Sequence, residues 1–223
     1  AATIAEQLQL FAARIDAGEM PNSLSPATVF HAMPAGHRLD RASPTGDPLR
    51  LPDPSTVPRR PNADRAIALS PLTHLATWLK RGEITSQKLT TIYLERIKRH
   101  NPTLKCVITT TATHALEQAA RADREHAEGI DRGPLHGMPY GAKDIIDTAG
   151  IATTWGAAPF KDRVATKNAF VIDRLDEAGA VLIAKTSLGA LAYGDQWFGG
   201  TTKNPWNTTQ GSSGSSAGSS SGT

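Results

Sequence analysis

Lys143 lies in a segment that could hold a lysine away from water. It occupies the middle of "PYGAKDIIDTAG", just before the apolar pair Ile145 and Ile146, where a strand is expected to end. Burial disfavours the charged form of a lysine, and a neutral lysine can accept a proton as a general base. The alternative, which this segment by itself favours, is a surface ion pair with Asp144 or Asp147.

A second group of reactive side chains lies in the Gly/Ser-rich stretch "NPWNTTQGSSGSSAGSSSGT", residues 204–223. Composition alone favours a flexible linker. However, Ser215 and Ser216 are flanked by Gly214 and Gly218, which permit close approach and backbone conformations that other residues avoid. The stretch is therefore either a linker or a catalytic loop.

Three chemistries could use such a loop. A phosphate-cradling loop ends in Lys-Ser or Lys-Thr, and nothing in residues 204–223 is basic. The segment "GSSAG" (214–218) matches a Gly-x-Ser-x-Gly nucleophile elbow with Ser216 as the nucleophile, but an elbow follows a hydrophobic strand and the preceding residues are polar. The third is a serine relay with a lysine in place of histidine as the base.

Helices and strands that alternate along the chain must position these residues. Apolar spacing and capping residues predict helices over 3–17, 70–80, 85–100, 112–129 and 169–180, and strands over 105–111, the centre of 135–147, and 181–185. Asn101-Pro102 is expected to end the helix that begins at 85, and Asn204-Pro205-Trp206 reads as a turn. Lys185, at the end of a buried strand, is expected to be structural. The alternation indicates an α/β fold with a mixed central sheet covered by helices.

Three segments are predicted. Residues 1–33 form an N-terminal helical segment, and residues 34–64 are a Pro-rich linker or arm, because their proline density forbids helix. The main domain covers residues 65–223.

Composition excludes several classes of protein. The 223 residues are 39% hydrophobic and 20% charged, which is enough for one sizeable core. The net charge of +3 comes from scattered basic residues, so direct nucleic-acid binding is not expected. No apolar run approaches the ~18 residues of a membrane span. Without a visible signal peptide, a cytoplasmic location is expected.

Metal and disulfide chemistry are not expected either. Cys106 is the single cysteine, so there is no intrachain disulfide framework and no cysteine cluster for a metal. The seven histidines show no ligand spacing. We therefore expect neither a metal nor another cofactor.

Four segments, in order, resemble the amidase-signature family, which includes amidases, fatty-acid amide hydrolases and the glutaminase subunits of tRNA-dependent amidotransferases. They are "RGPLHGMPYGAKDIIDTAGIATTWGA" (132–157), "DRLDEAGAVLIAKTSLGALA" (173–192), "FGGTTKNPWN" (198–207) and "GSSGSSAGS" (211–219). The resemblance runs from about residue 70 to 223. It implies the amidase-signature fold, incomplete in this chain, and makes the Gly/Ser stretch a catalytic loop.

The resemblance also implies site residues. Lys143 in "GAKD" matches the family's catalytic lysine. The family's bridging serine, which follows a cis peptide bond, matches Ser215 or Ser212. Ser215 is preferred because it restores the usual spacing from Asn-Pro-Trp. Gly214 and Ser216, on either side of it, are then expected to contact substrate.

The mechanism implied by the resemblance is acyl transfer. Neutral Lys143 accepts a proton through Ser215 from a second serine, which attacks a carboxamide and forms an acyl-enzyme. Backbone N–H groups would stabilise the oxyanion. The family places that nucleophile about two dozen residues after Ser215, beyond Thr223. We therefore expect the 223-residue chain to be truncated within its active site and inactive by itself.

Three functions remain open. The first is a stand-alone amidase acting on small-molecule carboxamides. Such an enzyme could be a homodimer. The second is the glutaminase subunit of a tRNA-dependent amidotransferase, which would bind partner subunits. The third is a non-catalytic protein that retains the fold. Residues 1–64 precede the usual start of the family and favour the stand-alone enzyme.

Overall fold

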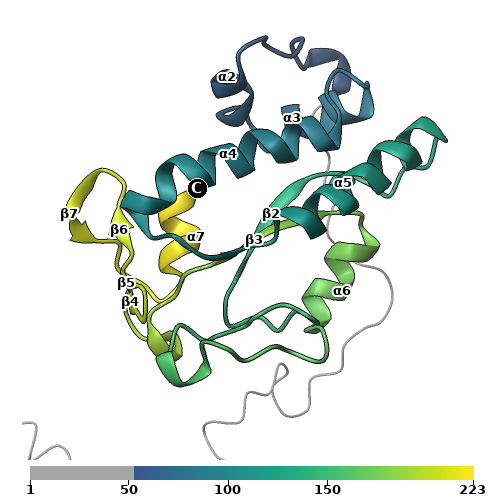
Figure 1. The fold of residues 1–223 in the computed structure, drawn as a ribbon. Helices are drawn as coiled ribbons and strands as arrows, with labels where there is room; N and C mark the ends of the chain where they lie inside the picture. Colours follow the sequence, from purple (N-terminus) through teal and green to yellow (C-terminus); the bar gives the residue numbers. More distant parts are fainter. Residues whose placement is uncertain (1–52) are drawn as a thin grey trace, which may run out of the picture. The chain divides into compact units, whose positions relative to one another are not determined.

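The computed structural model describes residues 53–223, drawn in colour in Figure 1. The helix predicted over 3–17 and the proline-rich residues 34–52 lie outside the described residues. No helix in the described part of the chain is long and apolar enough to cross a membrane.

A three-stranded mixed sheet forms the centre of the described region, in the order β1-β3-β2. Its strands are β1 (Val107–Thr110), β2 (Pro139–Lys143) and β3 (Val181–Thr186). β1 runs antiparallel to β3, and β2 runs parallel to it. The α/β fold with a mixed sheet is therefore confirmed, and Lys143, opposite Thr186, lies at the carboxyl end of β2.

Helices cover the sheet (Figure 1), and every residue of its central strand β3 is buried. The helices α4 (Ser86–Leu104) and α5 (Ala112–Ala127) belong to one apolar cluster, in which Ala115 and Ala119 join Val181 and Ile183 of β3. The helix α6 (Phe170–Glu177) belongs to another, in which Ile172 joins Leu182. Since successive strand residues point to opposite faces, a continuously buried strand needs a layer on each side.

The helix α4 shows where one sequence prediction was wrong. Its start is as expected, because the Thr85 side chain accepts a hydrogen bond from Lys88 N at 3.1 Å. It does not end at Asn101-Pro102 but continues to Leu104. Proline removes one helical donor but keeps a helical φ, and the Asn101 side chain ties this turn to Val107 of β1 by bonds of 2.8 and 3.0 Å.

The first described residues pack against the helices that follow them. The 3-10 turn η1 (Pro54–Thr56), α2 (Asp64–Ala68) and α3 (Leu72–Lys80) precede α4. The Trp78 indole of α3 is buried and donates to Pro58 O at 2.7 Å. This tryptophan joins a third apolar cluster with Val57, Ile67, Leu75, Leu79, Ile84, Leu89, Ile92 and Met138.

Short elements follow the sheet. The turns η2 (Ala158–Phe160) and η3 (Ala190–Ala192) flank β3, and two hairpins pair β4 (Gln196–Trp197) with β5 (Gly200–Thr201) and β6 (Lys203–Asn204) with β7 (Asn207–Gly211). Sequence reasoning did not predict these strands. The predicted Asn-Pro-Trp turn joins β6 to β7, with Trp206 N donating to Asn204 Oδ1 at 2.9 Å.

The end of the chain is a helix rather than a linker. Residues Ala217–Gly222 form α7, which lies beside β2 and β3 (Figure 1). Ala217, Gly218 and Ser221 are buried. The linker alternative for residues 204–223 is therefore wrong, because this stretch buries residues against the sheet.

Candidate active site

The Lys143 side chain meets the serine loop between β7 and α7. Its Nζ donates to Ser215 Oγ at 2.9 Å and to Ser216 Oγ at 3.1 Å. Lys143 and Ser215 are half-buried, and Ser216 is exposed at the N-cap position of α7. These distances fall within the range needed for proton transfer.

The surface ion pair considered for Lys143 is not formed within residues 53–223. Asp144 is fully buried and points to a different set of partners: its Oδ2 accepts hydrogen bonds from Thr154 N at 2.8 Å and Thr154 Oγ1 at 2.5 Å. Asp147 binds Arg163 at 2.8 and 2.7 Å. Because both carboxylates are engaged elsewhere, the lysine amine is left to the two serines.

Ser212, the other candidate for the bridging position, has different partners. Its hydroxyl donates to Ser213 O at 2.9 Å, and its backbone N donates to Thr202 O at 2.9 Å. The peptide bond between Gly214 and Ser215 is cis, which is the place that the resemblance predicted for one. The geometry thus brings Lys143 to Ser215.

Gly214 lies against another loop. A Cβ at this position would stand 1.9 Å from Gly194 O, so no side chain fits there. The next loop residue after Gly194 also contacts the serine loop: Asp195 Oδ2 accepts a hydrogen bond from Ser213 N at 3.0 Å. Sequence reasoning assigned no role to Asp195, because nothing local marks a contact across 18 residues. Loop 189–195 therefore packs against the serine loop and hydrogen-bonds to it.

The first turn of α7 is fastened to the end of β3. Gly218 N donates to Ser187 O at 2.8 Å, and the hydroxyls of Thr186 and Ser219 lie 2.9 Å apart. A Cβ on Gly218 would stand 2.1 Å from Cys106 O. The serines therefore sit on a helix start whose position is set by the sheet.

The nucleophile-elbow alternative does not fit this arrangement. An elbow places its serine directly after a buried strand. Here β7 precedes the loop, and every one of its residues is exposed. Ser216 is therefore not at an elbow, although it remains next to Lys143.

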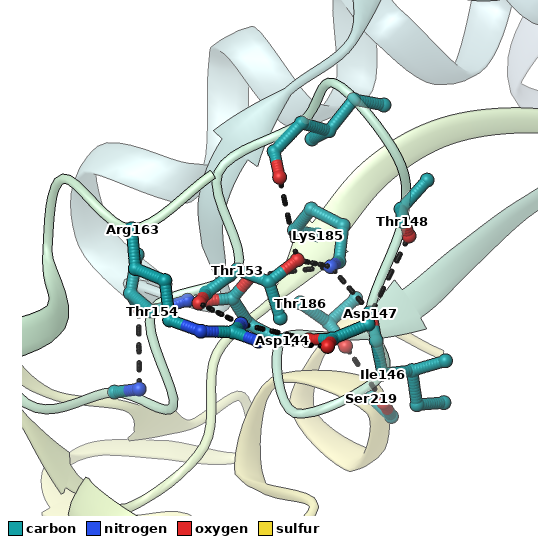
Figure 2. A network of polar contacts seen from close by, with 12 residues as sticks. Asp144, Ile146, Asp147, Thr148, Thr153, Thr154, Arg163, Lys185, Thr186 and Ser219 are labelled. Carbon is teal, nitrogen blue, oxygen red and sulfur yellow. Dashed lines mark hydrogen bonds and ion pairs between the residues drawn. The ribbon is translucent and has the colours of Figure 1, made fainter. Parts of the chain in front are cut away.

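A fully buried ion pair joins Lys185 to Asp144, the residue that follows Lys143 (Figure 2). Lys185 Nζ lies 3.4 Å from Asp144 Oδ1 and donates to Ile146 O at 2.7 Å and to Thr153 Oγ1 at 2.8 Å. Burial raises the pKa of the Asp144 carboxyl, against the opposing effect of the Thr154 hydrogen bonds. Burial likewise lowers the pKa of the Lys185 amine, against the attraction of Asp144.

Neither a metal cluster nor an activated thiol lies in the described region. No group of three or more His, Cys, Asp or Glu side chains is placed to hold a metal ion within residues 53–223. Cys106 is buried, and burial raises the pKa of its thiol, which disfavours the reactive thiolate.

In the described region, the end of a mixed sheet brings a lysine amine to two serine hydroxyls of a Gly/Ser-rich loop. The sequence profile of the Amidase family matches residues 88–222, which is more than half of the chain. The chain therefore belongs to the amidase-signature family.

Individual relatives agree with this assignment. The chain is 41% identical over 151 residues to the A-type subunit of the Glutamyl-tRNA(Gln) amidotransferase of Methylococcus capsulatus, a match that covers 66% of this chain and 31% of that protein.

Solved structures of amidases are also similar. The peptide amidase of Stenotrophomonas maltophilia is 36% identical with a TM-score of 0.63, covering 68% of this chain and 33% of that one. A fatty acid amide hydrolase is 26% identical with a TM-score of 0.66, covering 71% of this chain and 29% of that one. The chain thus spans about a third of the length of these relatives.

Proposed function

We propose that this protein hydrolyses the C–N bond of carboxamides, with Lys143 and Ser215 relaying protons for the attacking group. The observation that carries the proposal is the 2.9 Å hydrogen bond between Lys143 Nζ and Ser215 Oγ. The nearby carboxylates of Asp144 and Asp147 are bound to other residues, so neither forms an ion pair with Lys143 and its amine faces the serines. A neutral lysine is the form that can act as a base.

The relay would work in two half-reactions. Neutral Lys143 takes the hydroxyl proton of Ser215 while Ser215 takes the proton of the attacking serine. The attacking oxygen bonds to the carboxamide carbon, and the C–N bond breaks as the leaving amine receives a proton along the same route. Water, deprotonated by the same relay, then releases the acid.

The attacking serine is not among the residues that meet Lys143. Family resemblance places it further along the chain than Thr223, so the proposal concerns a protein that includes that serine. Ser216 and Gly214 flank the bridging serine, and Ser216 is exposed. We assign both to substrate contact, because they border the bridging serine, beside which the attacking serine and the substrate must lie.

A glutaminase subunit is the second candidate. It is favoured by the 41% identity to a protein named as a component of Glutamyl-tRNA(Gln) amidotransferase. The similarity to a peptide amidase favours the stand-alone enzyme instead. The two functions differ in substrate: the amidotransferase component would prefer glutamine and co-purify with partner proteins, whereas the stand-alone enzyme would do neither.

The test is ammonia release from a panel of primary carboxamides, glutamine included, by the product of the gene's whole reading frame. Lys143→Met and Ser215→Ala are expected to lower kcat/KM by about 10²- to 10⁴-fold, the usual contribution of general acid–base groups. Ser212→Ala is the matched control, since its hydroxyl donates to Ser213 O, and should leave the rate nearly unchanged. Equal losses in all three variants would contradict the relay.

The 223-residue chain by itself is expected to release no ammonia. Turnover by this chain that disappears in Lys143→Met would show that the attacking serine lies within residues 1–223. In that case the position assigned to the nucleophile would be wrong, while the role of Lys143 would stand.

A further inference from the structure

Lys185 and Asp144 are charged side chains with no part in the relay, although both are completely buried. A buried ion pair is weak evidence for stability, because the cost of removing two charges from water offsets their attraction. Their place in the structure points to another role. Asp144 directly follows Lys143, and Lys185 directly precedes Thr186, the residue opposite Lys143 in the sheet.

We propose that Lys185 and Asp144 are positioning residues that hold the Lys143 amine against the serine loop. The expected effect on kcat rests on the proposed function, whereas the placement of the Lys143 amine does not. It assigns a role to a pair of groups that never touch the substrate.

Several hydrogen bonds converge on Asp144, the residue after Lys143. Asp144 N donates to Thr186 O at 3.0 Å, and Asp144 O accepts from Trp155 N at 3.1 Å. Its carboxylate receives both the N–H and the hydroxyl of Thr154. The backbone of Lys143 is therefore fixed from its carboxyl side by β3 and by the loop that carries Thr154 and Trp155.

The Lys185 amine bridges two parts of the loop that follows β2 (Figure 2). It donates to Ile146 O and to Thr153 Oγ1, which stand on the two sides of the loop that follows β2. The Lys185 side chain of β3 thus holds the two parts of this loop together beside Asp144. A shift of the loop would move Asp144, and Lys143 with it.

The strand that carries Lys185 also contacts the helix that follows the serines. Thr186, next to Lys185, lies opposite Lys143 in the sheet, and its hydroxyl is 2.9 Å from Ser219 Oγ in α7 (Figure 2). Thr186 therefore contacts both the end of β2, where Lys143 lies, and α7, the helix that follows Ser215 and Ser216. A displaced β3 end would change the 2.9 Å distance between Lys143 and Ser215.

One carboxylate oxygen of Asp144 is incompletely paired, which favours a role in positioning Lys143 over a role in stabilising the fold. Its Oδ1 is buried and makes no hydrogen bond within residues 53–223, with Lys185 Nζ 3.4 Å away as its ion-pair partner. An oxygen left in this state costs free energy. A neutral pair of similar shape is thus expected to restore the stability that either single substitution removes.

The experiment compares Lys185→Met, Asp144→Asn and the double variant, using the product of the whole reading frame. Each single variant leaves one buried charge without its ion-pair partner and is therefore expected to lower Tm. The double variant is expected to recover most of the lost Tm, yet to keep kcat about 10- to 100-fold below that of the unaltered protein with little change in KM. A double variant that recovers kcat together with Tm would overturn the proposal, because the pair would then be merely structural.

A surface pair provides the matched control. Arg121 and Asp176 form an ion pair at 2.9 Å, with side chains 41% and 48% exposed. The variant Arg121→Met/Asp176→Asn carries the same kind of substitutions away from Lys143. Its kcat is expected to equal that of the unaltered protein, and an equal loss in both double variants would count against a specific role for Lys185 and Asp144.

A second readout separates this proposal from the proposed function. The rate at which formaldehyde and a borohydride methylate the Lys143 amine can be followed by peptide mass spectrometry without any turnover. Release of Lys143 from the serines in the Lys185→Met/Asp144→Asn variant is expected to raise this rate severalfold. If the unaltered protein hydrolyses no amide, the proposed function fails while this test still stands. An unchanged rate would overturn the positioning role.

Discussion

Gly218 and Cys106 lie in backbone contact: a Cβ on Gly218 would stand 2.1 Å from the carbonyl oxygen of Cys106. Gly218 is in the first turn of α7, and Cys106 immediately precedes β1. This contact lets the helix that follows Ser215 and Ser216 pack directly on the strand ends. Glycine is needed here because of space, not because of a special backbone conformation.

The first prediction follows from that contact. Gly218→Ala is expected to destabilise the fold by about 1–3 kcal/mol, since the added methyl group must displace backbone rather than a flexible side chain. Urea unfolding followed by circular dichroism measures the change. Gly222→Ala in the same helix is the control, because its Cβ would meet only Cys106 Sγ at an ordinary 3.6 Å. Equal effects at the two glycines would refute the packing argument.

A second prediction concerns Asp195, the residue behind the serine loop. Asp195→Ala removes the acceptor for Ser213 N and is expected to weaken the loop's closed position by about 1 kcal/mol. Hydrogen exchange of the Ser213 amide should accelerate about fivefold as a result. Asp195→Asn keeps an oxygen at the same place and should retain most of the protection. Exchange that is unaffected by Asp195→Ala would show that the bond does not hold the loop.

A third prediction concerns acid stability, through Glu125 of α5. Hydrogen bonds from Arg132, at 2.6 Å to each carboxylate oxygen, lower the pKa of Glu125 from 4.5 to about 2. A carboxyl whose folded pKa is depressed contributes stability that is fully present above pH 4.5 and is lost as the pH falls towards 2. His136 belongs to the same network, with its Nε2 2.9 Å from Glu125 Oε2. Burial and the neighbouring His126 lower the pKa of His136, and this shift too makes the folded state more stable at higher pH.

The measurement is urea unfolding of the unaltered protein and of Glu125→Gln between pH 7 and pH 2. At pH 7 the variant is expected to be about 1–3 kcal/mol less stable, because charge-assisted bonds to Arg132 are lost. The difference should shrink below pH 4.5 and nearly vanish near pH 2. A difference that stays constant across this range would mean that packing, rather than the charge of Glu125, causes the loss.

The predicted helices and strands were found wherever the sequence pattern that predicts them spans only a few neighbouring residues. The helices α3 to α6 and the strands of the central sheet have apolar spacing, caps and β-branched runs that act over a few residues, and the structure confirms them. The end of α4 was misplaced because proline's usual effect was overridden by Asn101, whose partner lies in the next strand. The short strands β4 to β7 were missed because their polar residues carry no periodic signal.

The sequence by itself determined that Lys143 and a Gly/Ser-rich loop could do chemistry, since residue type and local neighbours are properties of the chain. The family resemblance implied that Lys143 and Ser215 meet, but only the tertiary structure places Ser215 and Ser216, 72 and 73 residues away, at the Lys143 amine and pairs Asp144 with Lys185 instead. Those pairings depend on strand order and on the docking of α7. Such long-range contacts are selected by the packing of the whole sheet, which no local pattern encodes.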